Sequence, residues 1–180
     1  MALPEKRTHS IKEIYSLPDG QRAELIDGDF YMMAPPSRKH QMIVGELFGI
    51  IYAYLKAKNG FCTPYVAPFA VFLNKDDRNY VEPDICVICD RSKLTDAGCS
   101  GAPDWIIEVV SPGSRRMDYM IKLFKYRSAG VHEYWIVDPA KDTVLIYDFQ
   151  QNDMAFHSFS DTVTSRIYED LSIPFGEFDF

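Results

Sequence analysis

The sequence has no hydrophobic run long enough to cross a membrane. Its longest stretches without a charge, such as residues 47–55, fall well short of the ~18 apolar residues that a membrane-spanning helix needs. Residues 1–8 carry basic side chains with no apolar segment behind them, which does not fit a secretory signal. These two absences predict a protein with no membrane anchor, located in the cytoplasm.

Positive charge is also scarce. The chain of 180 residues has 19 Lys and Arg against 26 Asp and Glu, which gives a formal net charge of −7. Proteins that bind nucleic acid through its phosphates usually carry an excess of Lys and Arg on the binding face. The balance therefore argues against tight nucleic-acid binding, unless basic residues gather locally or acidic residues hold a cation.

Cysteines are few, and their spacing does not indicate a metal site. The pair Cys86 and Cys89 lies within a short β-branched segment that is typical of a buried strand, and side chains three apart on a strand point to opposite faces. The other two cysteines, Cys62 and Cys99, form no second pair of that spacing. We therefore expect four buried free thiols that behave as small hydrophobic side chains.

The remaining composition is that of an ordinary globular protein, with 47% hydrophobic and 25% charged residues. Two segments flank the turn dipeptide Asp27-Gly28, which predicts a hairpin over 22–26 and 29–33. Ser37 is placed to cap a long helix that ends at Asn59 and Gly60. A short helix is expected at 10–17.

The second half of the chain alternates strand and helix patterns. Ser114 can cap a helix over 115–129, and Gly130 can end it. Strands are expected at 84–89, 105–111, 133–137, 143–149 and 154–159, with an interrupted or edge strand at 61–73 and an irregular C-terminus. We expect one α/β (α+β) domain over 1–180: an N-terminal helix and hairpin at 10–33, a core of mixed sheet flanked by helices at 37–139, and C-terminal strands at 143–180.

Two of the expected strands carry an acidic residue in an apolar setting. Glu108 lies in the run 105–110, where an unpartnered carboxylate would be costly, so it needs a cation or a hydrogen-bond network. Asp84 starts a neighbouring strand and would meet Glu108 if the two strands pair. Asp104 shares the strand of Glu108 but lies about 13 Å from it at ~3.3 Å per residue, too far to share an ion.

The helix after Glu108 has a polar stripe opposite an apolar one. Mid-helix, Lys122 is placed to reach over the sheet, and Asp118 can hold its ammonium group as an i, i+4 pair. The polar stripe comprises Arg115, Asp118, Lys122, Lys125 and Tyr126, and the apolar one comprises Met117, Met120, Ile121 and Phe124. We expect the basic members of the polar stripe to supply a local basic surface.

Several segments together resemble a known family. They are ELIDG (24–28), SRKHQ (37–41), EPD (82–84), GAPDWIIEVVSP (101–112), the Asp118, Lys122 and Tyr126 series, and GVHEYWIVDP (130–139). This succession resembles the Uma-type family of endonucleases, within the restriction-endonuclease-like PD-(D/E)xK superfamily. The resemblance covers residues 24–139 and continues weakly to the C-terminus.

The resemblance implies a metal-dependent phosphodiester hydrolase. Asp84 and Glu108, with the Val109 carbonyl as a third oxygen, would hold Mg²⁺ or Mn²⁺. The superfamily pattern places a lysine at position 110, where this chain has Val110. In the resembling family a lysine from the following helix takes that place, which implies Lys122 here. The partner would be DNA, bound weakly and with the metal, and a homodimer would suit cleavage of both strands.

Other residues have weaker claims and simpler alternatives. Glu46 on the long helix is a candidate outer-shell carboxylate, although a solvated residue is the simpler interpretation. His40 is expected at the surface or in a cap, with a phosphate contact as its candidate role. The turn that begins at Ser111 lies between a strand and a helix, where free N–H groups could hold an anion.

Three interpretations of the whole pattern therefore stay open. The first is a metal-dependent endonuclease, in which Asp84, Glu108 and Lys122 are catalytic. The second is a catalytically inactive binding or regulatory module, in which Glu108 and Lys122 form a purely structural buried pair. The third is phosphate or nucleotide binding at residues 111–116.

Overall fold

A six-stranded mixed sheet forms the centre of the computed structural model, which describes residues 8–179. The strand order is β11-β10-β9-β8-β5-β3, with β8 and β9 parallel and every other neighbouring pair antiparallel. The strands are β3 (Thr63–Val66), β5 (Ile85–Ile88), β8 (Trp105–Val109), β9 (Glu133–Asp138), β10 (Thr143–Asp148) and β11 (Asp153–Ser158). The mixed sheet confirms the expected α+β fold.

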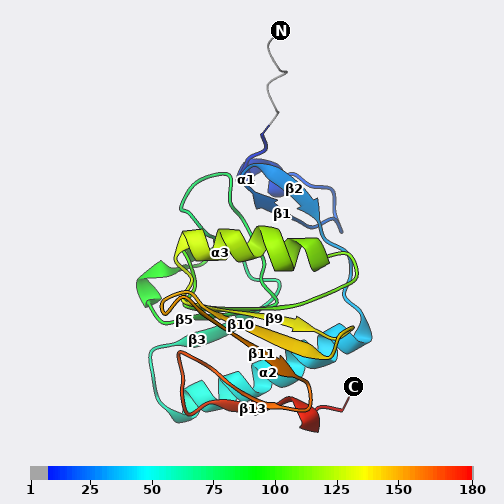
Figure 1. The fold of residues 1–180 in the computed structure, drawn as a ribbon. Coiled ribbons are helices and arrows are strands. Elements are labelled where there is room, and N and C mark those ends of the chain that lie inside the picture. The colour runs from blue at the N-terminus through cyan, green and yellow to red at the C-terminus, as the bar shows by residue number, and fades with distance from the viewer. Residues whose placement is uncertain (1–7, 180) are drawn as a thin grey trace.

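Helices cover both faces of this sheet (Figure 1). On one face lies α2 (Arg38–Ala57), which begins where the Ser37 side chain accepts a hydrogen bond from the His40 N–H. The other face is covered by a π-helical segment, η2 (Met117–Lys122), which continues into α3 (Leu123–Ala129) and ends at Gly130 with φ 94°. Each face has its own hydrophobic cluster, with the C-terminal segment joining α2.

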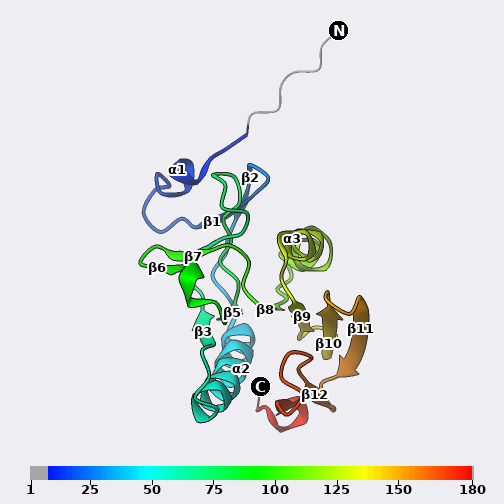
Figure 2. The same cartoon turned by 90° about the vertical axis from the view of Figure 1, so that its left-hand side faces the viewer.

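The N-terminal hairpin lies beyond α3, away from the sheet (Figures 1 and 2). It consists of β1 (Ala23–Ile26) and β2 (Asp29–Met32), preceded by the short helix α1 (Ile11–Ile14). At the turn, Asp27 and Gly28 have φ angles of 52° and 83°. This is the turn that the dipeptide predicts, because both central residues of a type I′ turn need positive φ.

Small elements complete the chain. The expected strand over 61–73 is interrupted: β3 forms the sheet edge, and β4 (Val71–Phe72) joins a separate sheet with β6 (Leu94–Thr95) and β7 (Gly98–Ser100). A 3-10 turn, η1 (Arg91–Lys93), precedes β6. The C-terminus is not wholly irregular, because it contains β12 (Thr162–Thr164), β13 (Ser172–Pro174) and η3 (Phe175–Glu177).

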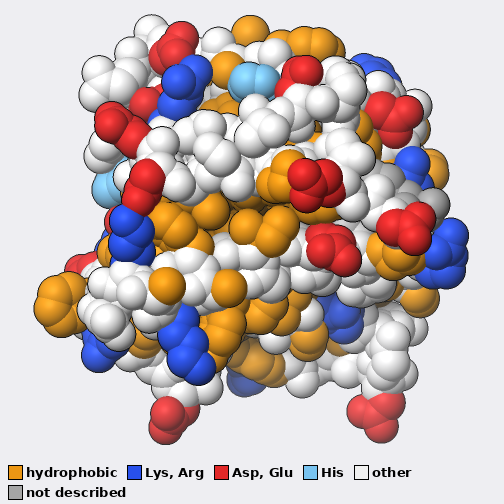
Figure 3. Space-filling view, turned by 90° about the horizontal axis from the view of Figure 1, so that it is seen from below, with side chains coloured by type: hydrophobic (Ala, Val, Ile, Leu, Met, Phe, Trp, Pro, Cys, Tyr) orange, Lys and Arg blue, Asp and Glu red, His pale blue; other side chains and the backbone are white. Residues whose placement is uncertain are grey.

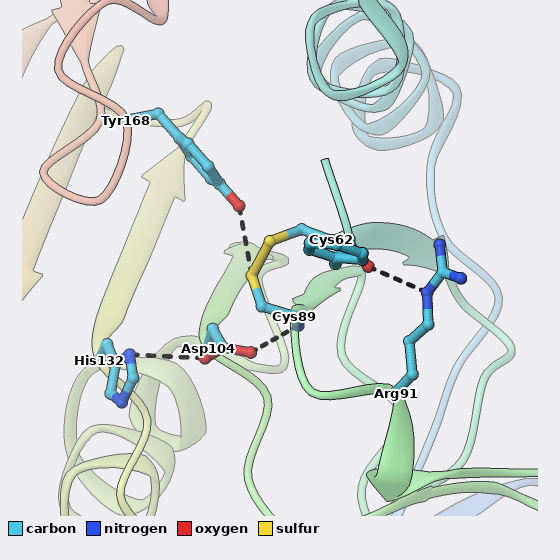
Figure 4. Close-up of a disulfide and its surroundings, with 7 residues drawn as sticks. Cys62, Cys89, Arg91, Asp104, His132 and Tyr168 are labelled. Atoms are coloured by element: carbon cyan, nitrogen blue, oxygen red, sulfur yellow. Dashed lines mark hydrogen bonds and ion pairs between the residues drawn. A yellow bond between two sulfur atoms is a disulfide. The ribbon is translucent and has the colours of Figure 1, made fainter. Parts of the chain in front are cut away.

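Two of the four cysteines correct the prediction of free thiols. Cys62 and Cys89 form a disulfide, whereas Cys86 and Cys99 are free and buried as expected. The antiparallel β3–β5 register pairs Thr63 with Ile88, so one step further places Cys62 opposite Cys89. Figure 4 shows this bridge, with the Tyr168 hydroxyl 3.4 Å from the Cys89 sulfur.

No helix within residues 8–179 combines the length and hydrophobicity needed to span a bilayer. The first seven residues, on which the expectation about a secretory signal rests, lie outside the described residues.

Candidate functional site

Glu108 lies on the face of β8 that α3 covers. Its neighbours in alternation, Ile106 and Val110, pack in the hydrophobic cluster on that face, whereas Ile107 and Val109 pack on the α2 side. The Glu108 side chain is buried, with the whole residue 4% exposed. A carboxylate at this position therefore depends on protein groups for its partners.

Asp84 stands directly before β5 and next to Glu108, as expected. The antiparallel register pairs Ile85 with Ile107, so one further step places Asp84 opposite Glu108 on the same face. The Asp84 carboxylate accepts a hydrogen bond of 2.8 Å from the Val109 N–H. Its same oxygen lies 3.2 Å from the His40 Nε2 atom.

Lys122 reaches the sheet from the end of η2. Its ammonium nitrogen lies 2.8 Å from Glu108 Oε1, and the Asp118 carboxylate is 4.0 Å away, one helical turn back. The Tyr126 hydroxyl donates a second hydrogen bond of 2.6 Å to the same Glu108 oxygen. The helix thus brings an ammonium group and a phenol to one carboxylate.

Glu24 on β1 is the member of the site that sequence reasoning missed. Its carboxylate lies 2.8 Å from the Lys122 nitrogen, and its other oxygen accepts the Glu82 N–H at 3.0 Å. The residue is 4% exposed, and all four residues of β1 are buried. The signal was an acidic residue within an apolar strand, the same signal that identified Glu108.

Burial dominates the acid–base properties of this cluster. It raises the pKa of Glu108 well above its ordinary value, with Lys122 opposing the shift and Asp84 adding to it. Burial also raises the pKa of Asp118 to about 6. Burial alone would lower the pKa of Lys122, but Glu108 and Glu24 raise it well above its ordinary value, so the amine keeps its proton.

The cluster therefore has more acidic than basic groups. Three carboxylates, those of Glu24, Glu108 and Asp118, lie around the ammonium group of Lys122, and a fourth, that of Asp84, lies beside Glu108. Carboxylates crowded in a poorly solvated region favour either a shared proton or an added cation. The arrangement can thus bind a positive ion or hold a proton at pH values where an exposed carboxyl would have lost it.

His40 is buried, which corrects the expectation of a surface or capping residue. It is 7% exposed, and its Nε2 atom faces Asp84. Burial lowers the pKa of His40, but the hydrogen bond and the charge of Asp84, together with Val109 and Asp118, outweigh this effect and raise the pKa above its ordinary value. The Nδ1 atom is buried and has no hydrogen-bond partner among residues 8–179. His40 thus extends the site toward the start of α2.

The two remaining candidates lie outside the buried cluster. Glu46 is exposed on α2, as a solvated helix residue would be. Ser111 lies in the turn after β8, where its N–H donates to the Ser114 hydroxyl at 2.9 Å and its own hydroxyl accepts the Ser114 N–H at 3.1 Å. Two backbone N–H groups of this turn are already bound, which weakens the interpretation of the turn as an anion site.

The basic stripe expected on the helix is not an exposed basic surface. Lys122 and Lys125 are buried, and Lys125 pairs with Asp27 at 2.6 Å. Arg115 donates to the buried Asp138 at 2.7 Å. The helix turns its polar stripe toward the sheet and leaves Met120 and Phe124 exposed, because the carboxylates on the sheet face are its partners.

The opposite side of the molecule also lacks a continuous basic surface among residues 8–179. Figure 3 views the face that α2 and the C-terminal segment form, where acidic and basic side chains are scattered around a band of hydrophobic ones. This face has no continuous basic surface among the described residues. Neither the helix stripe nor this face therefore supplies the local basic surface that the sequence suggested.

Asp104, which its spacing excluded as a metal ligand shared with Glu108, has a structural role at the other end of β8. It accepts the Cys89 N–H at 2.7 Å and lies 3.5 Å from His132 (Figure 4).

Beyond Glu108, at the opposite end of β8, a recess of about 390 Å³ opens between the α2 N-terminus and the turn after β8. Its lining includes Lys39, Ser111 and Arg115.

Comparisons with known proteins bear on the family and on the fold. The sequence model of the family described as "Uma2: Putative restriction endonuclease" matches residues 11–175. No curated protein matches the chain. The crystal structure of a "putative nuclease belonging to DUF820" from Anabaena variabilis ATCC 29413 is similar, with a TM-score of 0.76 and 20% sequence identity. The similarity covers 94% of this chain and 96% of that chain, and it shows a shared fold.

Proposed function

Because the chain belongs to the Uma2 family, we propose that it is an endonuclease that hydrolyses DNA phosphodiester bonds with a divalent metal ion. The observation that carries the proposal is the position of Asp84 opposite Glu108, with the Lys122 ammonium group 2.8 Å from Glu108. Two acids on neighbouring strands, with a lysine from the following helix beside them, are the groups that metal-assisted phosphodiester hydrolysis needs.

The donor set fits Mg²⁺ or Mn²⁺ if most of the ion's ligands are water and backbone oxygen. Within residues 8–179, no three His, Cys, Asp or Glu side chains gather closely enough to hold a metal. Mg²⁺ usually keeps several waters and takes only one or two carboxylates from the protein. Asp84 and Glu108, with the Val109 carbonyl, meet that requirement, and a cation would relieve the surplus of carboxylates.

When bound, the ion would lower the pKa of a coordinated water and stabilise charge that develops on the phosphate. The protein groups around it have separate tasks. Lys122 supplies a fixed positive charge beside the scissile phosphate, and Glu24 and Asp118 keep its ammonium group in place. Tyr126 orients Glu108, and His40 with the Val109 N–H orients Asp84.

DNA is the proposed partner, bound weakly and only together with the metal. The net charge of −7 and the pairing of Arg115 and Lys125 with acidic residues leave few free cations for phosphate contacts. Lys39 and Arg115 are the basic residues that line the 390 Å³ recess near the end of β8. The homodimer expected from cleavage of both strands stays a prediction.

Plasmid cleavage tests the proposal. Purified protein is incubated with supercoiled plasmid and Mn²⁺, and conversion to nicked and linear forms is measured for the wild type and for Asp84→Asn, Glu108→Gln and Lys122→Met. The wild type should cleave, and each variant should lose at least ~100-fold in rate, which corresponds to about 3 kcal/mol of transition-state stabilisation.

Glu169→Gln serves as the matched control, because Glu169 is an exposed acid on the C-terminal segment. It should cleave as the wild type does. Melting curves establish that each variant is folded. If the wild type cleaves supercoiled, linear and single-stranded DNA no faster than Asp84→Asn in either Mn²⁺ or Mg²⁺, the proposal is wrong.

A second candidate function is a catalytically inactive binding or regulatory module. The observation that favours it is that Lys122 already neutralises Glu108. Calorimetric titration with Mn²⁺ separates the two functions. Saturable binding that disappears in Glu108→Gln argues against the inactive module, whereas absence of binding in the wild type supports it.

A further inference from the structure

The outer strand of the sheet, β11, has hydrophobic side chains that residues 8–179 leave largely exposed. Met154 is 55% exposed and Phe156 is 64% exposed. The register places them opposite Tyr147 and Leu145, which pack in the hydrophobic cluster on the α3 face. Met154 and Phe156 therefore lie on the same face of the sheet as α3. Their strand, β11, is the outer strand of the sheet (Figure 2). Exposed apolar groups gathered at one place commonly mark an interaction surface.

The backbone of β11 is also open on its outer side. In an antiparallel pair, alternate residues direct their backbone N–H and C=O groups toward the partner strand. The Phe159 N–H donates to the Asp142 carbonyl, so residues 153, 155 and 157 also bond inward to β10. Met154, Phe156 and Ser158 point outward. The Ser158 N–H donates to Asp161, but no hydrogen bond is found for the Met154 and Phe156 N–H groups within residues 8–179.

Edge strands of soluble monomers usually carry devices that prevent pairing with another chain, such as lysine, proline, a bulge or a covering loop. Within β11 the sequence is DMAFHS, which has no Lys, Arg, Pro or Gly. Its pairing with β10 is regular over six residues, with no bulge. The strand is thus a regular edge on which Asp153 is the one acidic side chain, and it has no lysine, proline or bulge.

We propose that β11 pairs antiparallel with β11 of a second copy of this chain, about a two-fold axis at Ala155. The two six-stranded sheets then form one continuous sheet, with both α3 helices on the same face. An antiparallel pair of identical strands is self-complementary, because each contact occurs twice. This inference does not rest on the proposed nuclease function.

The register follows from hydrogen bonds and charge. With the axis at Ala155, Met154 faces Phe156 of the second copy, and their outward N–H and C=O groups bond to each other. Asp153, which lies 3.5 Å from Arg166 of its own chain, faces His157 of the second copy, whose ring N–H can donate a hydrogen bond to the Asp153 carboxylate. Both of these side chains lie on the other face of the sheet from Met154.

Neighbouring registers are less favourable. An axis at Phe156 would place Met154 against Ser158, whose N–H is already bound to Asp161. An axis at Met154 would place Phe156 against Asn152, which has φ 55° and belongs to the turn. Neither register brings Asp153 opposite His157. Only the axis at Ala155 pairs the outward N–H and C=O groups of Met154 and Phe156 and also brings Asp153 opposite His157.

Two measurements on the full chain test the proposal. Sedimentation velocity should show a dimer of the 20.7 kDa chain, and Phe156→Lys should raise the dimer dissociation constant at least tenfold. Glu169→Lys, which adds the same side chain at an exposed site on the C-terminal segment, should leave the dimer unchanged. Melting curves establish that Phe156→Lys is folded.

Cysteine cross-linking tests the register. Ala155 on the axis faces Ala155 of the second copy in a non-hydrogen-bonded pair, where Cβ atoms lie close enough for a disulfide. Under mild oxidation Ala155→Cys should form a covalent dimer and Asp153→Cys should not. A wild type that is monomeric at ~100 μM, a Phe156→Lys protein as dimeric as the wild type, or a dimer in which Ala155→Cys does not cross-link would overturn the proposal.

Discussion

The Lys122 ammonium group and the Glu24 carboxylate lie 2.8 Å apart, and both residues are buried. Lys122 ends the helical segment η2, and Glu24 lies on β1 of the N-terminal hairpin. The same nitrogen is 2.8 Å from Glu108 on the central sheet. One buried cation thus joins the hairpin, the helix and the sheet, so the stability of the fold and the candidate chemistry depend on the same contacts.

Replacing Lys122 with methionine should destabilise the protein strongly. The change keeps the length of the side chain but leaves Glu24 and Glu108 buried without their cation. Removing one partner from a buried ion pair costs about 3–5 kcal/mol. Urea denaturation should show that loss in the free energy of unfolding.

The matched control for this variant is Lys12→Met, because Lys12 is exposed on α1. Its free energy of unfolding should stay within about 0.5 kcal/mol of the wild type. Adding Glu24→Gln to Lys122→Met should recover part of the loss. A Lys122→Met protein as stable as Lys12→Met would contradict the account of the cluster.

Tyr126→Phe should have a smaller effect in the same direction. The variant loses the 2.6 Å hydrogen bond to Glu108 and keeps the ring, which packs edge-on against Tyr134. A hydrogen bond to a charged group contributes about 1.5–3 kcal/mol. Tyr15→Phe, at an exposed tyrosine, should leave the free energy of unfolding unchanged. Equal free energies of unfolding for Tyr126→Phe and Tyr15→Phe would show that the Tyr126 hydroxyl does not stabilise the fold.

Asp118 should make stability depend on pH. Burial raises its pKa from 3.8 to about 6, so the folded state takes up a proton that the unfolded chain binds only near pH 4. A raised pKa of this kind stabilises the fold most below pH 4, and the contribution is lost as the pH rises through 6. Asp118→Asn lacks this titration.

We therefore compare the wild type with Asp118→Asn in EDTA, because other titrating groups are common to both proteins. The stability of Asp118→Asn relative to the wild type should increase by about 1–1.5 kcal/mol between pH 5 and pH 8, which is roughly half of the total that a shift of about two pH units gives. A constant difference over this range would mean that Asp118 titrates normally.

Reducing the Cys62–Cys89 disulfide should lower stability without unfolding the site. The bridge closes a loop with a sequence separation of 27, and a cross-link of that length contributes about 3–4 kcal/mol by restricting the unfolded chain. Denaturation midpoints should fall when dithiothreitol is added to the wild type. The double variant Cys62→Ser with Cys89→Ser should not respond to the reductant, and a wild type that also fails to respond would contradict the bridge.

The acidic half of the candidate site could be predicted from sequence for a local reason. A carboxylate within an apolar strand, such as Glu108, needs a partner wherever the strand lies. Spacing along one strand excluded Asp104, and pairing of adjacent strands was enough to select Asp84. These arguments need only strand geometry, which the local pattern supplies.

Glu24 and the orientation of α3 could not be predicted in that way. Periodicity shows that the helix has a polar and an apolar stripe, but not which of them faces the sheet. The usual expectation of an inward apolar stripe fails because Glu108 supplies a charged partner for Lys122 on the sheet face. Glu24 meets Lys122 only through tertiary packing of the hairpin over the helix.

The disulfide was missed for a related reason. Cys62 and Cys89 become neighbours only in the β3–β5 register, which depends on long-range pairing. The spacing of Cys86 and Cys89 carried no information about Cys62, which is the disulfide partner of Cys89. Contacts between distant segments are the part of the fold that local pattern leaves open.

Crystals of the protein soaked in Mn²⁺ and measured at the manganese absorption edge test the central claim most directly. The account predicts an anomalous peak within coordination distance of both Asp84 and Glu108, beside the Lys122 ammonium group, and no such peak in Asp84→Asn crystals. A manganese ion bound elsewhere, or no peak at these carboxylates at saturating Mn²⁺, would contradict it.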